Sequence, residues 1–250
     1  MAPRANWKGY LKIAEVTCPV ALYTAASQSD RVAFHMLNRA SGHRLNRQFV
    51  DSETGRVVDR EQQVKGYELS KGEYVVLEPD EISAALPVSD KTLLVEAFIS
   101  CGEIDSLYFD RPYYLGPGNE NAEESYNLIR EGLKSAKVAA IARAVLFRRM
   151  RSVLIRAHGP GIIATTLNFD YEVRAAEEVF SDIPKKKVKG EMLELAEHII
   201  STKRGKFDPA KFDDRYEEAL AELVKAKAAG KPVPTAAPRK SAEVVSPGDR

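Results

Sequence analysis

The chain has 250 residues, of which 44% are hydrophobic and 29% are charged. These values are ordinary for globular proteins and exclude disorder over the whole length, and the length allows one large domain with appendages. A formal net charge of +1 gives no indication of a nucleic-acid partner by itself.

Neither the cysteines nor the N-terminus indicate export. Cys18 and Cys101 are far apart in apolar surroundings, which is typical of buried free thiols and not of a disulfide framework. The apolar run 16–26 is short, follows Glu15 and contains Pro19, so it is a poor signal peptide. No run approaches the roughly 18 apolar residues of a membrane helix. We expect a cytoplasmic protein.

The N-terminal half is rich in short strand-like segments. Residues 7–23 read as one strand and 31–37 as a second, closed by the turn-rich 38–42. A hairpin is expected between 49–50 and 57–58, with Gly55 at its turn, and another between 64–69 and 74–77 around Lys71-Gly72. One helical turn is expected at 81–85 and a strand at 93–99. Strands at about ten-residue spacing favour a barrel or sandwich over βαβ units.

The C-terminal half adds helices. The run Leu115-Gly-Pro-Gly-Asn119 ends the strand pattern, and residues 121–137 have helical spacing with Tyr126, Ile129, Leu133 and Ala136 on one side. Residues 138–147, 152–157 and 162–169 read as strands. Residues 191–202 and 209–229 read as amphipathic helices, and the second of these ends before Gly230, a typical C-terminal cap. We therefore predict a core at 6–184, a basic linker at 185–190, a helical arm at 191–231 and a disordered tail at 232–250.

Charge is distributed unevenly along the chain. Residues 132–169 contain seven Lys or Arg and no acid, whereas residues 73–110 contain nine acids and one base, Lys91. A fold that separates these two stretches would have a strongly positive face, which suits a phosphate backbone. Solvated outer faces of strands are an equally good interpretation, since blocks of sequence need not become surface patches.

The sequence lacks the common motifs of catalysis. It contains no phosphate-binding P-loop, no Gly-x-Gly-x-x-Gly and no Gly-x-Ser-x-Gly elbow. The four histidines (His35, His43, His158 and His198) have no metal-ligand spacing with each other or with cysteine. We predict no catalytic residues, no metal and no cofactor, although an enzyme could still assemble a site from dispersed residues.

Binding chemistry is present instead. Arginines and amides interleave through residues 31–56, and further basic residues follow up to residue 151. Arginine forks and amides suit phosphate and sugar contacts, which position a protein without reading bases; ordinary surface arginine is the alternative for each. The predicted phosphate contacts are Arg31, His35, Arg39, Arg44, Arg47, Arg56, Lys65, Lys134, Lys137, Arg143, Arg148, Arg149 and Arg151.

Several ordered motifs resemble the bacterial Ku family over about residues 6–231. They are Trp7-Lys-Gly-Tyr-Leu-Lys-Ile13 with Pro19-Val-Ala-Leu-Tyr23, Phe34-His-Met-Leu-Asn-Arg39, Asp51-Ser-Glu-Thr-Gly55, and Val64-Lys-Gly-Tyr-Glu68 with Gly72-Glu-Tyr-Val-Val-Leu77. The most specific is Ile104-Asp-Ser-Leu-Tyr-Phe-Asp-Arg-Pro-Tyr-Tyr114.

The resemblance implies a mainly antiparallel β-barrel of mixed α/β content, with bridge excursions and a C-terminal helical arm. It implies a homodimeric ring around double-stranded DNA ends, bound without reading sequence, in non-homologous end joining near the nucleoid. It also implies recruitment and stimulation of an ATP-dependent multifunctional DNA ligase. The candidate ligase contacts are Phe212, Tyr216, Leu220 and Leu223 in the helical arm. The tail carries only Lys231, Arg239, Lys240 and Arg250 as basic residues, so we expect little from it.

A second hypothesis comes from a different class of function. The barrel could be a scaffold that holds the ligase while DNA contact is incidental. Charge reversal at Arg44, Arg47, Arg148 and Arg149 would then leave DNA affinity intact. A catalytic barrel is a third and more distant hypothesis.

Overall fold

The computed structural model describes residues 4–27, 29, 31–85, 90–184 and 189–231. The chain divides into two compact units, each described here by itself. The first unit joins Met1–Gln28 to Asn46–Pro184, and the second joins Ser29–Leu45 to Lys185–Arg250. In the described residues, no helix combines the length and the apolar run needed to cross a membrane.

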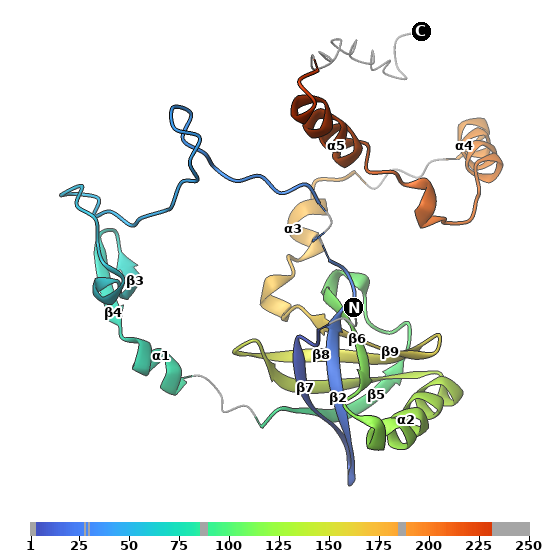
Figure 1. Cartoon of the computed structure of the whole chain (residues 1–250). Helices are drawn as coiled ribbons and strands as arrows, with labels where there is room; N and C mark the ends of the chain where they lie inside the picture. The colour runs from blue at the N-terminus through green and yellow to red at the C-terminus, as the bar shows by residue number, and fades with distance from the viewer. Residues whose placement is uncertain (1–3, 28, 30, 86–89, 185–188, 232–250) are drawn as a thin grey trace. The chain divides into compact units, whose positions relative to one another are not determined.

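A closed seven-stranded barrel forms the body of the first unit, with the strand order β1-β2-β6-β9-β8-β7-β5 (Figure 1). Neighbouring strands are antiparallel except β1 and β5, which pair in parallel and close the barrel. The predicted fold class, a mainly antiparallel β-barrel, is confirmed. The strands are β1 (Trp7–Ile13), β2 (Val16–Thr24), β5 (Thr92–Ser100), β6 (Phe109–Pro117), β7 (Val138–Leu146), β8 (Arg149–His158) and β9 (Gly161–Leu167).

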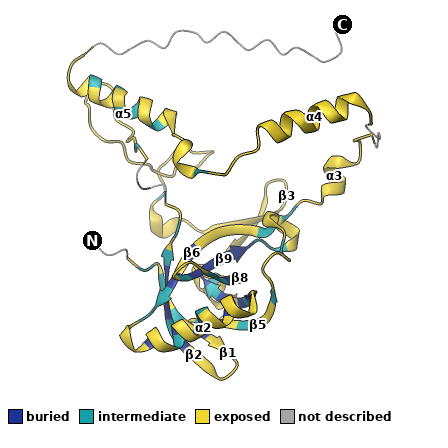
Figure 2. Cartoon of the chain, turned by 90° about the vertical axis from the view of Figure 1, so that its right-hand side faces the viewer, coloured by how far each residue is buried: buried dark blue, intermediate teal, exposed yellow. Residues whose placement is uncertain are grey.

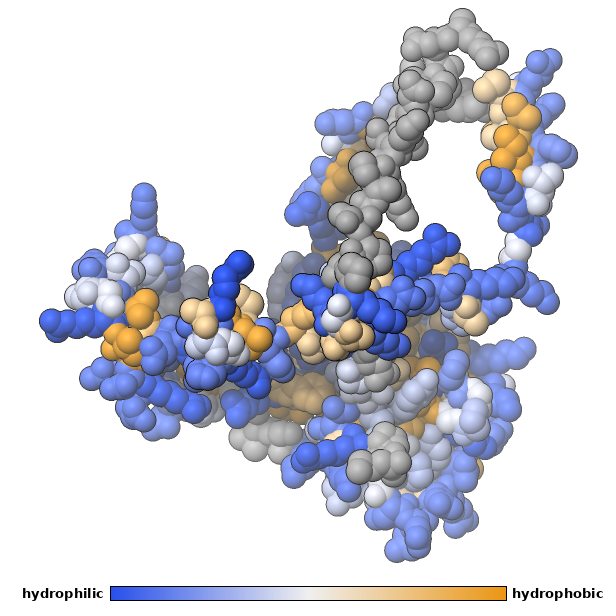
Figure 3. All heavy atoms as spheres, turned by 45° about the horizontal axis from the view of Figure 1, so that its top comes forward, coloured by the Kyte–Doolittle hydropathy of each residue, from blue (hydrophilic) through white to orange (hydrophobic). Residues whose placement is uncertain are grey.

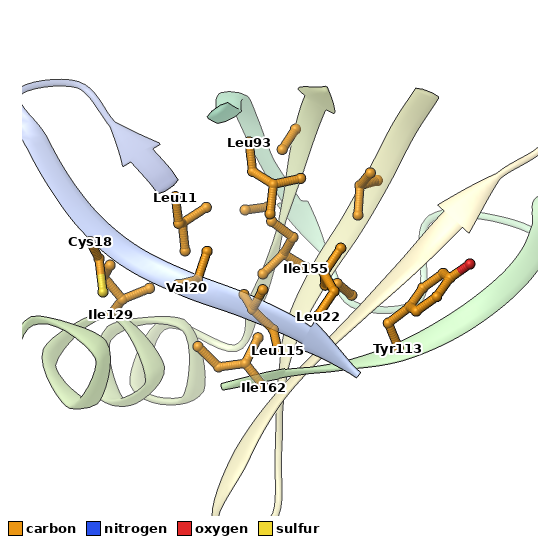
Figure 4. Close-up of a cluster of buried hydrophobic side chains, with 14 of the residues drawn as sticks. Leu11, Cys18, Val20, Leu22, Leu93, Tyr113, Leu115, Ile129, Ile155 and Ile162 are labelled. Carbon is orange, nitrogen blue, oxygen red and sulfur yellow. The ribbon is translucent and has the colours of Figure 1, made fainter. Parts of the chain in front are cut away.

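The barrel is filled by branched side chains that point inward from alternate strand positions. Leu11, Leu22, Leu93 and Ile155 are each at most 1% exposed and pack in one cluster (Figure 4). Helix α2 (Glu123–Ala136) adds Tyr126, Ile129 and Leu133 to the same cluster, as its helical spacing predicted. Because closure leaves no free sheet edge, the barrel satisfies its own backbone and buries its own core.

Two strand predictions in the barrel are wrong. Residues 7–23 form two strands, because Ala14 and Glu15 make a two-residue turn with Ala14 at φ 49°. The strand pattern does not end at Leu115 either, since β6 continues to Pro117. Pro112 is tolerated there because the β6–β9 register shifts next to it, and a bulge is where a strand accepts proline.

Residues 46–85 form an excursion between barrel strands β2 and β5. It contains the 3₁₀ turn η1 (Arg60–Gln62), the hairpin of β3 (Lys65–Ser70) and β4 (Glu73–Leu77), and helix α1 (Pro79–Ala85). Val50 and Val57 form an antiparallel bridge around Gly55, which has φ +66°. Both predicted hairpins and the helical turn are therefore confirmed. No residue of the excursion is buried (Figure 2).

Short elements complete the first unit. They are the 3₁₀ turns η2 (Ser106–Tyr108), η3 (Glu120–Ala122) and η4 (Asp170–Glu172) and helix α3 (Ala176–Phe180). Asp105 caps η2, where its side chain accepts a hydrogen bond from the Leu107 amide at 2.9 Å. The turn η2 lies between β5 and β6, η3 precedes α2, and η4 and α3 follow β9.

The second unit carries the two C-terminal helices, α4 (Glu191–Thr202) and α5 (Arg215–Ala228). Helix α4 has the predicted bounds, but α5 begins six residues later than predicted because Pro209–Lys211 forms the separate 3₁₀ turn η5. Residues 31–37 form no strand; Leu37 makes only an isolated bridge to Arg44. The Val32 amide donates to Glu217 of α5 at 2.8 Å. Residues 185–188 of the predicted linker at 185–190, and the predicted tail at 232–250, lie outside the described residues.

Candidate nucleic-acid interface

A basic groove lies where the excursion meets the turn between β7 and β8. Its volume is about 440 Å³. Three predicted phosphate contacts from distant parts of the sequence, Lys65, Arg148 and Arg149, line it together. Its other walls come from Gln63, Val64, Leu77, Pro79, Ile82 and Ser83. The structure thus joins the two basic stretches at one place.

The groove is cationic because three basic side chains line it and no acidic side chain does. Its remaining lining residues are apolar or neutral, and Lys65, Arg148 and Arg149 are exposed. Three cations of one sign gathered at one place raise the local concentration of anions. The groove can therefore attract and hold a phosphate backbone.

The β7–β8 turn presents Arg148 in an unusual backbone conformation. Leu146 pairs with Arg149, which leaves Phe147 and Arg148 as a two-residue turn. Their φ angles are 53° and 67°, which Asn or Gly adopts at much lower cost in such turns. Strain of this kind persists where the surrounding structure holds it, and it clusters at binding sites.

Two other predicted contacts are already ion-paired. The Arg143 guanidinium lies 3.2 Å from a carboxylate oxygen of Glu96, and that of Arg151 lies 3.4 Å from Asp110. Both acids come from the acidic stretch of sequence. The barrel places β5 beside β7, so the acidic and basic stretches partly neutralise each other instead of separating.

The predicted contacts Lys134 and Lys137 lie at the other end of β7. Lys137 caps α2 at φ 56° and precedes the first residue of the strand. The nine residues of β7 rise about 3.3 Å each, so its ends are roughly 25–30 Å apart. The basic stretch is therefore not one patch, and these two lysines are separated from the groove.

The remaining predicted contacts are exposed but scattered. Arg47 and Arg56 lie on the excursion, outside the lining of the groove. Arg31, His35, Arg39 and Arg44 belong to the second unit, where an Arg44 nitrogen lies 3.0 Å from Nδ1 of His35. Both Arg44 and His35 are exposed, so this contact leaves them accessible to a phosphate.

The predicted ligase contacts lie on or just before α5. Phe212 and Tyr216 are 71% and 70% exposed, and the Phe212 ring packs on Phe207 with 5.3 Å between centroids. Leu220 and Leu223 are half-buried. Figure 3 shows apolar side chains on the surface of α4, at the right of the view, and on the excursion, at the left. Helix α4 therefore offers apolar surface that the prediction of a partner contact did not include.

A second recess, the polar cleft, was missed by the sequence analysis. It consists of two hollows of about 620 and 270 Å³ that share Asp110, Arg111, Tyr113 and Phe147. Three of these residues lie in the motif 104–114, which marked the family but suggested no pocket. In the described part of the chain, no group of three or more His, Cys, Asp or Glu side chains could hold a metal ion.

Comparison with known proteins identifies the fold and its relatives. The family described as "Ku70/Ku80 beta-barrel domain" matches residues 12–195. A "Non-homologous end joining protein Ku" of Cereibacter sphaeroides is 60% identical over 242 residues, covering 96% of this chain and 91% of the relative. The protein of the same name from a Bradyrhizobium species is 44% identical over 247 residues, covering 98% and 85%. The SPOC domain of human PHD-finger protein 3 aligns with a TM-score of 0.31 at 12% identity, covering 67% of this chain and 99% of that domain.

Proposed function

The chain belongs to the Ku family, and from this premise we propose that it binds double-stranded DNA ends in non-homologous end joining. Binding is independent of base sequence and involves no catalytic step or cofactor. The basic groove is the observation that carries the proposal, because it gathers Lys65, Arg148 and Arg149 and has no acid among its lining residues. Contacts to phosphate oxygens position a protein on DNA without reading bases. A protein with this function belongs in the cytoplasm, at the nucleoid.

We further propose that the active form is a homodimeric ring. The excursion exposes Tyr67, Leu69, Tyr74 and Val76 by more than half of their surfaces. Tyr67 lies on the same face of the hairpin as Val75, and Tyr74 and Val76 lie on the opposite face. An isolated two-stranded hairpin is marginally stable in water, and exposed apolar side chains on both of its faces indicate a partner. A second copy is the simplest partner, because twofold symmetry buries the same surface on both chains. Two excursions can then enclose a duplex that neither encloses alone.

The helical arm is the proposed contact for the ATP-dependent multifunctional DNA ligase of bacterial end joining. Aromatic side chains such as Phe212 and Tyr216 are favoured at the centres of protein interfaces. Their exposure in the second unit supports such a contact. In this proposal the barrel and excursion hold the DNA, and the helical arm recruits and stimulates the ligase.

The test compares linear duplex DNA with the same DNA covalently closed into a circle, across a salt series. We expect binding to the linear form and loss of most affinity for the circle, because a closed ring loads only from an end. Affinity should fall steeply with salt, by a slope of about 0.9 per phosphate contact.

The double variant Arg148→Gln/Arg149→Gln should weaken binding, whereas Arg174→Gln, an exposed arginine away from the groove, serves as the matched control. Equal binding to both DNA forms at moderate salt would overturn the ring. Unchanged DNA affinity in the double variant, with ligase recruitment intact, would favour the scaffold hypothesis instead.

A further inference from the structure

The polar cleft lies on the other side of the β7–β8 turn from the basic groove. Phe147 lines the cleft and its neighbour Arg148 lines the groove. Consecutive Cα atoms are about 3.8 Å apart, so one turn borders both recesses. A DNA strand whose phosphates contact the groove needs to pass only this turn to reach the cleft.

The floor of the cleft is a partly buried hydrogen-bond network centred on Thr166. The Thr166 hydroxyl is buried and donates to a carboxylate oxygen of Asp110 at 2.9 Å, and Arg151 lies 3.4 Å from the same oxygen. The Arg111 amide donates to the Thr166 hydroxyl at 3.1 Å. These bonds fix the backbone of Asp110 and Arg111 before any ligand arrives, so the site is preorganised.

Two polar groups at this floor are available to a ligand. The Arg111 side chain is 76% exposed and its nearest carboxylate oxygen, on Asp110, is 3.9 Å away. Tyr113 is 7% exposed as a residue, and its hydroxyl makes no hydrogen bond to another described residue. Since the described residues include no buried side-chain oxygen without a partner, this hydroxyl is the part of Tyr113 that solvent reaches. Figure 4 shows this hydroxyl directed away from the other labelled core side chains, and Tyr113 lines both hollows.

An aromatic wall completes the cleft. The Phe147 ring is 47% exposed and packs on the Tyr113 ring with 5.8 Å between centroids and a 30° tilt. Phe147 occupies a turn position at φ 53°, where Asn or Gly is favoured. The turn itself does not favour a bulky aromatic residue at this position, so a contact made by the ring explains Phe147 better than the turn does.

We propose that the polar cleft takes one unpaired nucleotide. The base stacks on the exposed face of Phe147, its polar edge hydrogen-bonds the Tyr113 hydroxyl, and its phosphate pairs with Arg111. Stacking on an aromatic ring with an arginine at the phosphate is how proteins hold single-stranded nucleic acid without reading sequence. The inference rests on the proposed function for the source of the nucleotide, which is the unpaired end of a DNA strand; a free nucleotide has the same chemistry.

The test uses the full chain and a duplex closed by a hairpin loop at one end. The open end is either blunt or carries one unpaired 3′ nucleotide, 2-aminopurine, whose fluorescence is quenched by stacking. We expect the overhang to bind about tenfold more tightly than the blunt end, with quenching. Free 2-aminopurine deoxynucleoside monophosphate is the second arm.

Two variants locate the effect. Phe147→Asn and Arg111→Gln should each bring the overhang-to-blunt affinity ratio close to one. The ratio is the readout, because Phe147 shares its turn with Arg148 of the basic groove. Arg204→Gln, an exposed arginine that lines neither hollow of the cleft, should keep the tenfold ratio. Asparagine tolerates positive φ, but Phe147→Asn also removes the packing on Tyr113, so the thermal midpoint of each variant is measured. Arg111→Gln changes a side chain that is 76% exposed, so its loss of preference cannot be attributed to unfolding.

The outcomes separate the inference from the proposed function. A ratio of one in the unmodified chain, with normal blunt-end binding and no binding of the mononucleotide, overturns the nucleotide site alone. Absence of blunt-end binding by the unmodified chain overturns the proposed function. Mononucleotide binding that depends on Phe147, without any overhang preference, assigns the cleft to free nucleotides.

Discussion

The barrel and the excursion differ in what each can stabilise without help. The barrel has a closed ring of strands and a core in which Leu22, Leu93 and Ile155 have no accessible surface. The excursion has four consecutive elements and no buried residue. Hydrophobic burial is the main force that offsets the entropy of ordering a chain, and of these two regions only the barrel has buried residues.

This difference shows which region buries its apolar side chains within one chain and which leaves them exposed. The barrel needs no partner, so its sequence serves packing. The excursion keeps apolar residues such as Val75 and Val76 on a hairpin that solvent surrounds, so its sequence serves a surface formed by association. The basic groove lies where these two regions meet, which makes DNA binding sensitive to both.

The largest expected effect is in the barrel. Ile155→Ala should lower the free energy of unfolding by about 2–5 kcal/mol, because a fully buried branched side chain leaves a cavity. Urea unfolding followed by circular dichroism measures it. Leu128→Ala is the control, since Leu128 on α2 is 69% exposed and should cost less than about 0.5 kcal/mol. Equal losses in the two variants would mean that the barrel core does not dominate stability.

The second effect is in the excursion and concerns association. Val76→Asp on β4 should weaken self-association about tenfold or more, because a charge on an apolar interface must be desolvated without a partner. Sedimentation velocity across a concentration series measures it, and the thermal midpoint of the barrel should stay within error. Lys71→Ala, in the turn of the same hairpin, is the control. A dimer that tolerates Val76→Asp would place the interface elsewhere.

Local signals in the sequence predicted most of the fold. Gly55 and Lys71-Gly72 marked their turns because positive φ favours glycine, and helix α2 followed from its apolar spacing. The turn at Ala14 and Glu15 was missed because neither residue marks a turn, and Pro112 concealed β6 because its bulge forms only against β9. Residues 31–37 had strand composition but no neighbouring strand to pair with.

The candidate site was predicted in composition but not in arrangement. Lys65 and Arg148 are far apart in the sequence, and only the folded first unit brings them to one groove. The pairing of Arg143 with Glu96 depends on the register of β5 against β7. Local patterns carry no information about such long-range contacts. The sequence therefore identified basic residues as candidates, but it could not show which of them line the groove and which are ion-paired.

The third effect compares free and paired arginines of the same stretch. Arg148→Gln/Arg149→Gln should lower DNA affinity about tenfold or more and reduce the slope of log affinity against log salt by about 2. Arg143→Gln should change both much less, because Glu96 already neutralises Arg143. Fluorescence anisotropy on blunt duplex across a salt series measures both quantities. An equal loss in Arg143→Gln would mean that the ion pair opens on binding.

The smallest effect concerns the contact between α2 and the barrel at high pH. Burial raises the pKa of the Tyr126 phenol above its ordinary value of 10.0, and its hydroxyl donates to the Leu115 carbonyl at 2.7 Å. Below pH 10 both folded and unfolded chains keep this proton, so stability is unaffected. Above pH 10 the unfolded chain ionises first, and the free energy of unfolding falls until the folded pKa is reached.

Urea unfolding at pH 8 and pH 10.5 measures this loss, and the Tyr126→Phe variant separates it from other alkaline effects. The variant should lose about 1 kcal/mol at pH 8, where the hydrogen bond is missing, but should lose less than the unmodified chain between the two pH values. Tyr171→Phe, at a site 81% exposed, should match the unmodified chain at both. If Tyr126→Phe showed the same alkaline loss as the unmodified chain, the pH dependence would arise from groups other than the Tyr126 phenol, and the α2 contact would not be its source.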